Sequence, residues 1–137
     1  MRWRGGWAWR QPILFALHLG IGVLGLGLVL WGLSGLGIGD EVAALHVVGI
    51  GGVGGMTLAV MSRASLGHSG RPLVAPRPVA VGYGLLVLVA VLRWWGAGFD
   101  GAGYLPLMAV ISLLWSLVFL LYLVALWSTW LKPRGAT

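Results

Sequence analysis

The chain has 137 residues, of which 59% are hydrophobic and only 9% are charged, with a formal net charge of +6. So few charged residues cannot cover the surface of a soluble globular protein, and the composition therefore indicates a membrane protein. The basic residues lie in short segments between apolar runs, a pattern that sets membrane topology and argues against nucleic-acid binding. Cysteine is absent, which excludes a disulfide framework, a thiolate metal site and a covalently attached c-type haem.

Four apolar runs follow one another at residues 12–33, 42–62, 79–95 and 105–127. Each has roughly the 17 to 25 residues that an α-helix needs to cross about 30 Å of hydrocarbon. The runs lack the alternation of a barrel strand, and the first is too long for the apolar core of a signal peptide. We expect a single transmembrane domain, residues 1–137, that folds in the lipid bilayer as an all-α four-helix up-down bundle with sequential helices as neighbours.

The charges of the connecting segments predict the orientation of this bundle, because arginine and lysine are enriched on the cytoplasmic side of membrane proteins. The opposite connections contain Arg93 with the acidic residues Asp40, Glu41 and Asp100. We therefore predict a multi-pass protein of a bacterial-type inner (cytoplasmic) membrane, with both termini in the cytoplasm. The basic residues before the first run, between the second and third, and after the fourth are Arg2, Arg4, Arg10, Arg63, Arg71, Arg77, Lys132 and Arg134.

Glycines are frequent within the first two runs and twice match the G-x-G-x-x-G dinucleotide pattern. That pattern needs a preceding strand and a phosphate at a helix N-terminus, and both matches lie inside apolar runs, so we interpret them as packing glycines. In lipid, small residues let helix backbones approach closely. Gly51, Gly55 and Ala59 form such a stripe, which a 3.6-residue period places roughly opposite His46.

Two histidines lie within the first two runs, and an ionisable side chain inside a membrane span is a functional-site hypothesis. His18 and His46 each lie roughly two turns from the start of their runs, so antiparallel helices hold them something like 15 Å apart along the membrane normal. One haem cannot take both as axial ligands, which favours separate sites or sites completed by another chain. Composition alone favours the alternatives, in which His18 is a packing residue that donates to a backbone carbonyl of a neighbouring helix and His46 is hydrated near the outer headgroups.

The surroundings of the other histidine and of the first-helix glycines leave similar alternatives. His68 follows the second run in a polar segment, where it is either a third ligand or an exposed loop residue. Gly22 and Gly25 share the face of His18. This face is either a shallow groove for a flat ligand such as a porphyrin or the site of a close helix crossing. Periodicity alone favours the crossing.

The residues PILFALHLGIGVLGLGLVLWGL (12–33) and ALHVVGIGGVGGMTLAVMSRASLGHSGRPL (44–73) carry a family resemblance. They resemble the C-terminal part of the NnrS family of haem- and copper-containing membrane proteins associated with the nitric oxide response. The resemblance covers residues 12–95 and is most specific at residues 56–73. It implies haem b, with copper as a second candidate, and ligation by His46, His18 and His68. Arg63 and Arg71 would then hold the haem propionates, although basic residues at this boundary also meet lipid phosphates.

Members of the family usually have more spans than this chain. We therefore expect a homo-oligomer or docking to a larger membrane complex. The first interpretation is a small haem-binding membrane protein of the nitric oxide response or of respiratory metabolism. The alternative is a cofactor-free accessory subunit of a larger membrane complex, and a transporter with His46 as proton carrier is a third. An enzyme would also need electrons and an open coordination position, so enzymatic activity is left undecided.

Overall fold

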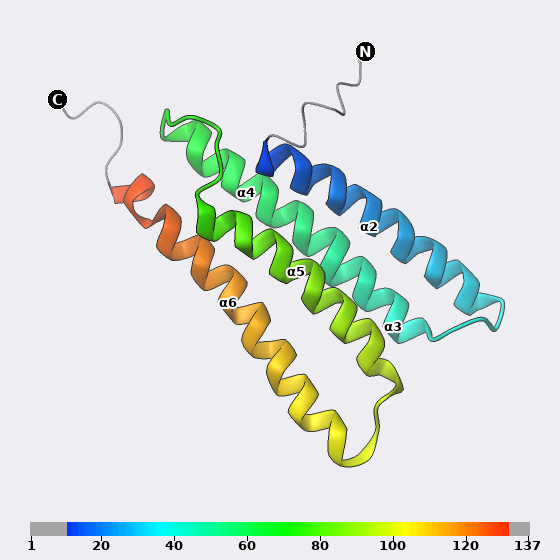
Figure 1. Ribbon diagram of the computed structural model, residues 1–137. Coiled ribbons are helices and arrows are strands. Elements are labelled where there is room, and N and C mark those ends of the chain that lie inside the picture. The colour runs from blue at the N-terminus through cyan, green and yellow to red at the C-terminus, as the bar shows by residue number, and fades with distance from the viewer. Residues whose placement is uncertain (1–10, 132–137) are drawn as a thin grey trace, which may run out of the picture.

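The structure, a computed structural model, describes residues 11–131 and contains four helices in that range that are long and apolar enough to cross a membrane (Figure 1). The predicted all-α membrane architecture is confirmed. The first span is α2. The second span is one continuous helix that consists of α3, the π-helix η1 and α4. The 3₁₀ turns η2 and η3 connect the third span, α5, to the fourth, α6. Their bounds are α2 Pro12–Gly35, α3 Glu41–His46, η1 Val47–Gly54, α4 Gly55–His68, α5 Arg77–Trp95, η2 Gly96–Gly98, η3 Gly101–Gly103 and α6 Tyr104–Leu131.

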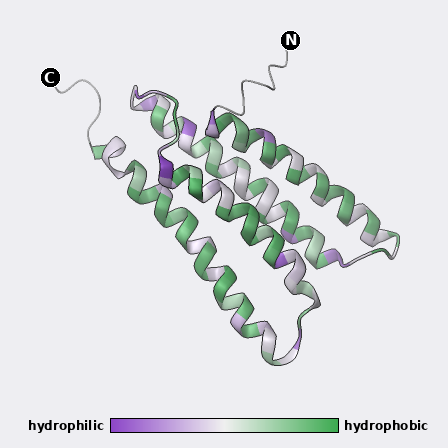
Figure 2. Cartoon of the chain, viewed as in Figure 1, coloured by the Kyte–Doolittle hydropathy of each residue, from purple (hydrophilic) through white to green (hydrophobic). Residues whose placement is uncertain are grey.

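Apolar side chains cover most of the outer surface of the spans. Figure 2 shows hydrophobic residues along the helices and hydrophilic residues gathered towards their ends. Leu113 and Val124 of α6 are 71% and 69% exposed, values that suit contact with lipid tails and would be costly in water. The surface therefore supports a bilayer environment. The orientation in the membrane stays a prediction, and Arg2, Arg4, Arg10, Lys132 and Arg134 lie outside the described residues.

Two left-handed glycines end the first two spans. Gly37 (φ +81°) follows α2 and Gly70 (φ +65°) follows α4, and each belongs to a Schellman motif that satisfies the last helical carbonyls. At the second site, the Gly70 N–H donates to the Gly67 carbonyl oxygen at 3.0 Å and the Arg71 N–H to that of Leu66 at 2.9 Å. These conformations suit glycine because they demand a positive φ.

The second span is longer than predicted, and this corrects the position of His68. Its helix does not end at residue 62, where the expected membrane thickness was reached, but continues to His68, the last residue of α4. Membrane thickness limits the length of the apolar run, whereas backbone capping ends the helix. The prediction of a loop position for His68 is therefore wrong, although its side chain is exposed.

Sequential spans are neighbours, as predicted, and lie side by side in the order α2, second span, α5, α6 (Figure 1). The backbone of α6 approaches α4 and α5 but neither α2 nor η1. We call the end of the bundle with Asp40, Glu41 and Asp100 the acidic end. The end with Arg63, Arg71 and Arg77 is the basic end.

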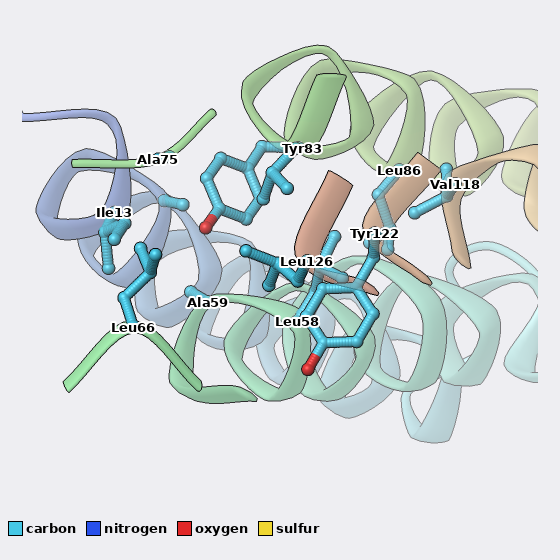
Figure 3. Close-up of a cluster of buried hydrophobic side chains, with 12 residues drawn as sticks. Ile13, Leu58, Ala59, Leu66, Ala75, Tyr83, Leu86, Val118, Tyr122 and Leu126 are labelled. Atoms are coloured by element: carbon cyan, nitrogen blue, oxygen red, sulfur yellow. The ribbon is translucent and has the colours of Figure 1, made fainter. Parts of the chain in front are cut away.

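The main hydrophobic core lies in the half of the bundle nearer the basic end. All four spans contribute to it, and Figure 3 shows these side chains converging. The start of α2 and the last third of α6 both contribute to this cluster, although their backbones do not approach each other. The spans are therefore held most firmly at the basic end. The fully buried side chains of this core include Ile13, Leu58, Val79, Leu86, Val118 and Leu126.

Candidate functional site

His46 is the candidate ligand whose geometry best suits coordination. It is half-buried at the end of α3, and its Nδ1–H donates to the carbonyl oxygen of Val42 at 2.6 Å. A carbonyl can only accept, so this bond places the proton on Nδ1 and leaves the lone pair of a neutral ring on Nε2. A second-nitrogen bond of this kind orients metal-binding histidines.

The π-helix η1 decides which face of the second span His46 occupies. Each i→i+5 bond takes in one residue more than an α-helical bond, and one residue is about 100° of rotation. The 3.6-residue period that placed His46 opposite Gly51 therefore does not hold across this segment. Ile50, one turn after His46 and within the π-helix, packs against the core. Such π segments are frequent at functional sites.

His18 lies on the outer surface of α2. Its Nδ1–H donates to the Leu14 carbonyl oxygen at 2.7 Å, the same pattern as at His46, but its side chain is exposed. Gly20, which is two residues further along, faces Met56 of the second span, so His18 points roughly away from that span. A ligand held by His18 would lie on the outside of this chain.

The glycines beside His18 do not form a helix crossing with any other part of residues 11–131. A Cβ built at Gly22 or Gly25 would meet nothing within 4 Å. The close crossing that periodicity favoured is instead made by other glycines: a Cβ at Gly27 would lie 2.9 Å from the backbone nitrogen of Val48. The face of Gly22 and Gly25 is open, as a flat ligand or another helix would require.

The other three predicted site residues lie near the basic end, in α4 or just after it. Arg63 and His68 are exposed on α4. Arg71 is half-buried, and its Nη2 donates to the carbonyl oxygen of Ser128 at 3.2 Å, which ties the connection after α4 to α6. Arg71 therefore has a structural role whatever else it binds.

The structure keeps His18 and His46 apart, as the antiparallel arrangement predicted. Gly20 of α2 lies opposite Met56, and Gly27 lies opposite Val48. His46, two residues before Val48, therefore lies opposite a residue near position 29 of α2, 11 residues from His18. The two rings are thus about 16 Å apart along the helix axes. Within residues 11–131, no three His, Cys, Asp or Glu side chains come close enough to hold a metal ion together.

Sequence reasoning missed a group of buried hydroxyls at the basic end. Ser65 of α4 and Tyr122 of α6 have their hydroxyl oxygens 3.0 Å apart. Tyr83 of α5 is 8% exposed, and its hydroxyl has no hydrogen-bond partner by geometry, although the Ser62 hydroxyl faces it. The Ser62 hydroxyl donates instead to the Leu58 carbonyl oxygen at 2.7 Å. Polar residues inside apolar runs were the available signal.

Four apolar spans with two imidazoles among them define a multi-pass helical membrane protein. A protein-family model described as NnrS protein matches residues 1–134. The chain therefore belongs to the NnrS family and is a membrane protein related to the nitric oxide response. The match includes the fourth span, which the resemblance seen in the sequence did not cover. No curated protein and no solved structure matches the chain.

Proposed function

We propose that this protein binds haem b through His46 and acts in the response to nitric oxide or in respiratory metabolism. The observation that carries the proposal is the hydrogen bond from His46 Nδ1–H to Val42, which presents Nε2 from a half-buried position within a span. A haem held by one histidine supplies an open coordination position for a diatomic gas such as nitric oxide. Family membership makes nitric oxide the fitting gas.

The role of this chain's residues is to orient and shield the bound group. The Val42 carbonyl holds the His46 ring in one tautomer and one orientation, which leaves the Nε2 lone pair available to a bound group. Trp115 reaches from α6 to Gly54, where a built Cβ would lie 3.2 Å from its ring. The indole therefore covers the second span two π-helical turns below His46 and helps to exclude water from that side.

The remaining candidates belong to a second site or to an assembly. His18 would hold a group on the outer face of α2, so a site there needs another chain to enclose it. A homo-oligomer in the inner membrane, with both termini in the cytoplasm, provides that chain. A copper site needs several ligands close together. Residues 11–131 contain no group of three His, Cys, Asp or Glu side chains that could hold a metal ion, so the copper proposal also requires an assembly. Arg63 and Arg71 lie at the basic end, about 25 Å from His46 along the second span, so they would meet the propionates of a haem at His18 and not those of a haem at His46.

The open glycine face of α2 favours a second candidate function, a cofactor-free accessory subunit of a larger membrane complex. Gly22, Gly25, Gly32 and Gly35 all have nothing within 4 Å of a built Cβ. Exposed small residues suit contact with another transmembrane helix. In this function the histidines are packing residues at the contact.

The visible spectrum of the detergent-purified protein tests the first proposal. We expect a Soret band that His46→Ala removes and His68→Ala, a matched substitution at the exposed end of α4, leaves unchanged. In His46→Gly, added imidazole should restore the band, because the free ligand occupies the vacated coordination position. A loss caused only by unfolding would not be reversed by imidazole.

Other results contradict the proposal. A colourless wild-type protein that co-purifies with other membrane subunits supports the accessory-subunit function. A Soret band that survives His46→Ala but disappears in His18→Ala moves the site to the outer face of α2 and refutes the assignment to His46.

A further inference from the structure

An apolar groove runs along the bundle between α2 and α5, with the second span as its floor. The part at the acidic end has a volume of about 470 Å³, and the part nearer the middle of the spans has about 380 Å³. Leu30 and Trp94 line both parts, so the two are continuous. The groove exists because α2 and α5 pack on opposite sides of the second span and meet each other only sparsely.

The depth of the groove matches one leaflet of a bilayer. From Leu33 at the acidic end to Val23 at its deepest point, α2 rises by about 15 Å, which is half of the roughly 30 Å hydrocarbon thickness. Below Val23 the groove closes, because a Cβ at Gly51 would lie 2.5 Å from Val23 Cγ1. A transmembrane helix needs the full thickness, so a groove of this depth fits an acyl chain better than a helix.

The mouth of the groove differs from its body in having one acidic residue, Asp40, in an otherwise mostly apolar lining. Asp40, Trp94 and Trp95 line the mouth, and both indoles are about half exposed. One oxygen of Asp40 accepts from the Ala43 N–H at 2.6 Å and caps α3, and the residue also lines the mouth of the groove. Arg93 is half-buried and does not line the groove.

We propose that this groove binds one phospholipid with an ammonium headgroup, such as phosphatidylethanolamine, from the leaflet at the acidic end. The acyl chain lies in the apolar body, and the ammonium group lies at Asp40, between the carboxylate and the indole faces. An anionic headgroup would meet the Asp40 carboxylate without compensation. The proposal is independent of any cofactor at the histidines.

The test is lipid retention by native mass spectrometry after reconstitution in nanodiscs of phosphatidylethanolamine and phosphatidylglycerol. We expect wild-type protein to retain phosphatidylethanolamine preferentially. Asp40→Asn keeps the helix cap, since asparagine caps as well as aspartate, and should lower this preference by roughly threefold to fivefold. Asp100→Asn also removes one negative charge, but Asp100 does not line the groove, so this substitution should leave the preference unchanged.

A second pair of variants tests the body of the groove. Val91→Trp fills it from α5 and should lower retention of both lipids, whereas Val124→Trp, on the exposed face of α6, should not. Equal retention of the two lipids by wild-type protein, or a preference unaffected by Asp40→Asn, overturns the proposal. Retention unaffected by Val91→Trp overturns the assignment of the acyl chain to this groove.

Discussion

Alanine substitutions at four glycines of the second span test the contact on which the bundle depends. A built Cβ meets nothing within 4 Å at Gly49, and at Gly55 the nearest atom is Leu86 Cδ2 at 3.8 Å. At Gly51 it lies 2.5 Å from Val23 Cγ1, and at Gly52 it lies 2.9 Å from the Cα of Leu24. The last contact is with backbone, so no rotamer change relieves it and the two helices must separate.

The expected changes in the free energy of unfolding follow from two opposing effects. Alanine in place of glycine favours a helix by up to about 1 kcal/mol, and overpacking costs about 1–3 kcal/mol. Gly49→Ala should thus be neutral or stabilising, with Gly55→Ala close to it. Gly51→Ala and Gly52→Ala should be destabilising, Gly52→Ala by about 1–2 kcal/mol net.

Equilibrium unfolding in mixed micelles with increasing dodecyl sulfate, followed by circular dichroism, measures these differences. Gly49→Ala is the matched control for the intrinsic effect of alanine. If Gly52→Ala and Gly49→Ala unfold within about 0.5 kcal/mol of each other, the close contact between α2 and the second span is refuted.

Three further predictions concern the core at the basic end. Tyr83→Phe removes a buried hydroxyl that has no hydrogen-bond partner, so stability should hold or rise; a loss above about 1 kcal/mol would show that Ser62 accepts its bond after all. A double-mutant cycle of Ser65→Ala and Tyr122→Phe should give a coupling of about 0.5–1.5 kcal/mol for their 3.0 Å hydrogen bond, and zero coupling would contradict it. Leu126→Ala, at a side chain with no exposure, should cost about 2–5 kcal/mol in the same unfolding assay, and a cost below about 1 kcal/mol would mean that the last third of α6 is not packed as described.

The two ends of the bundle differ in a way that bears on function. At the basic end all four spans converge on one core, whereas at the acidic end α6 leaves the second span and the groove opens between α2 and α5. His46 lies in the half nearer the acidic end, although the π-helix that follows it packs closely against α2. Sites that bind ligands belong in such regions, because a fully packed core leaves no room for them.

The sequence by itself determined the class of the protein, the number of spans and the identity of the candidate ligands. Hydropathy suffices for this because the bilayer demands long apolar helices from each span separately. The antiparallel order also followed from short connections, and with it the separation of His18 from His46. These properties depend on local composition and on the order of the runs alone.

Only the tertiary structure decided which faces meet and where the second span ends. A 3.6-residue period does not hold between His46 and Gly55, because residues 47–54, which pack closely against α2, form a π-helix that has no signature in the local sequence. His68 became helical because a glycine cap, and not the membrane boundary, ends α4. The groove between α2 and α5 has no signature in either helix, since it arises from how both pack on a third.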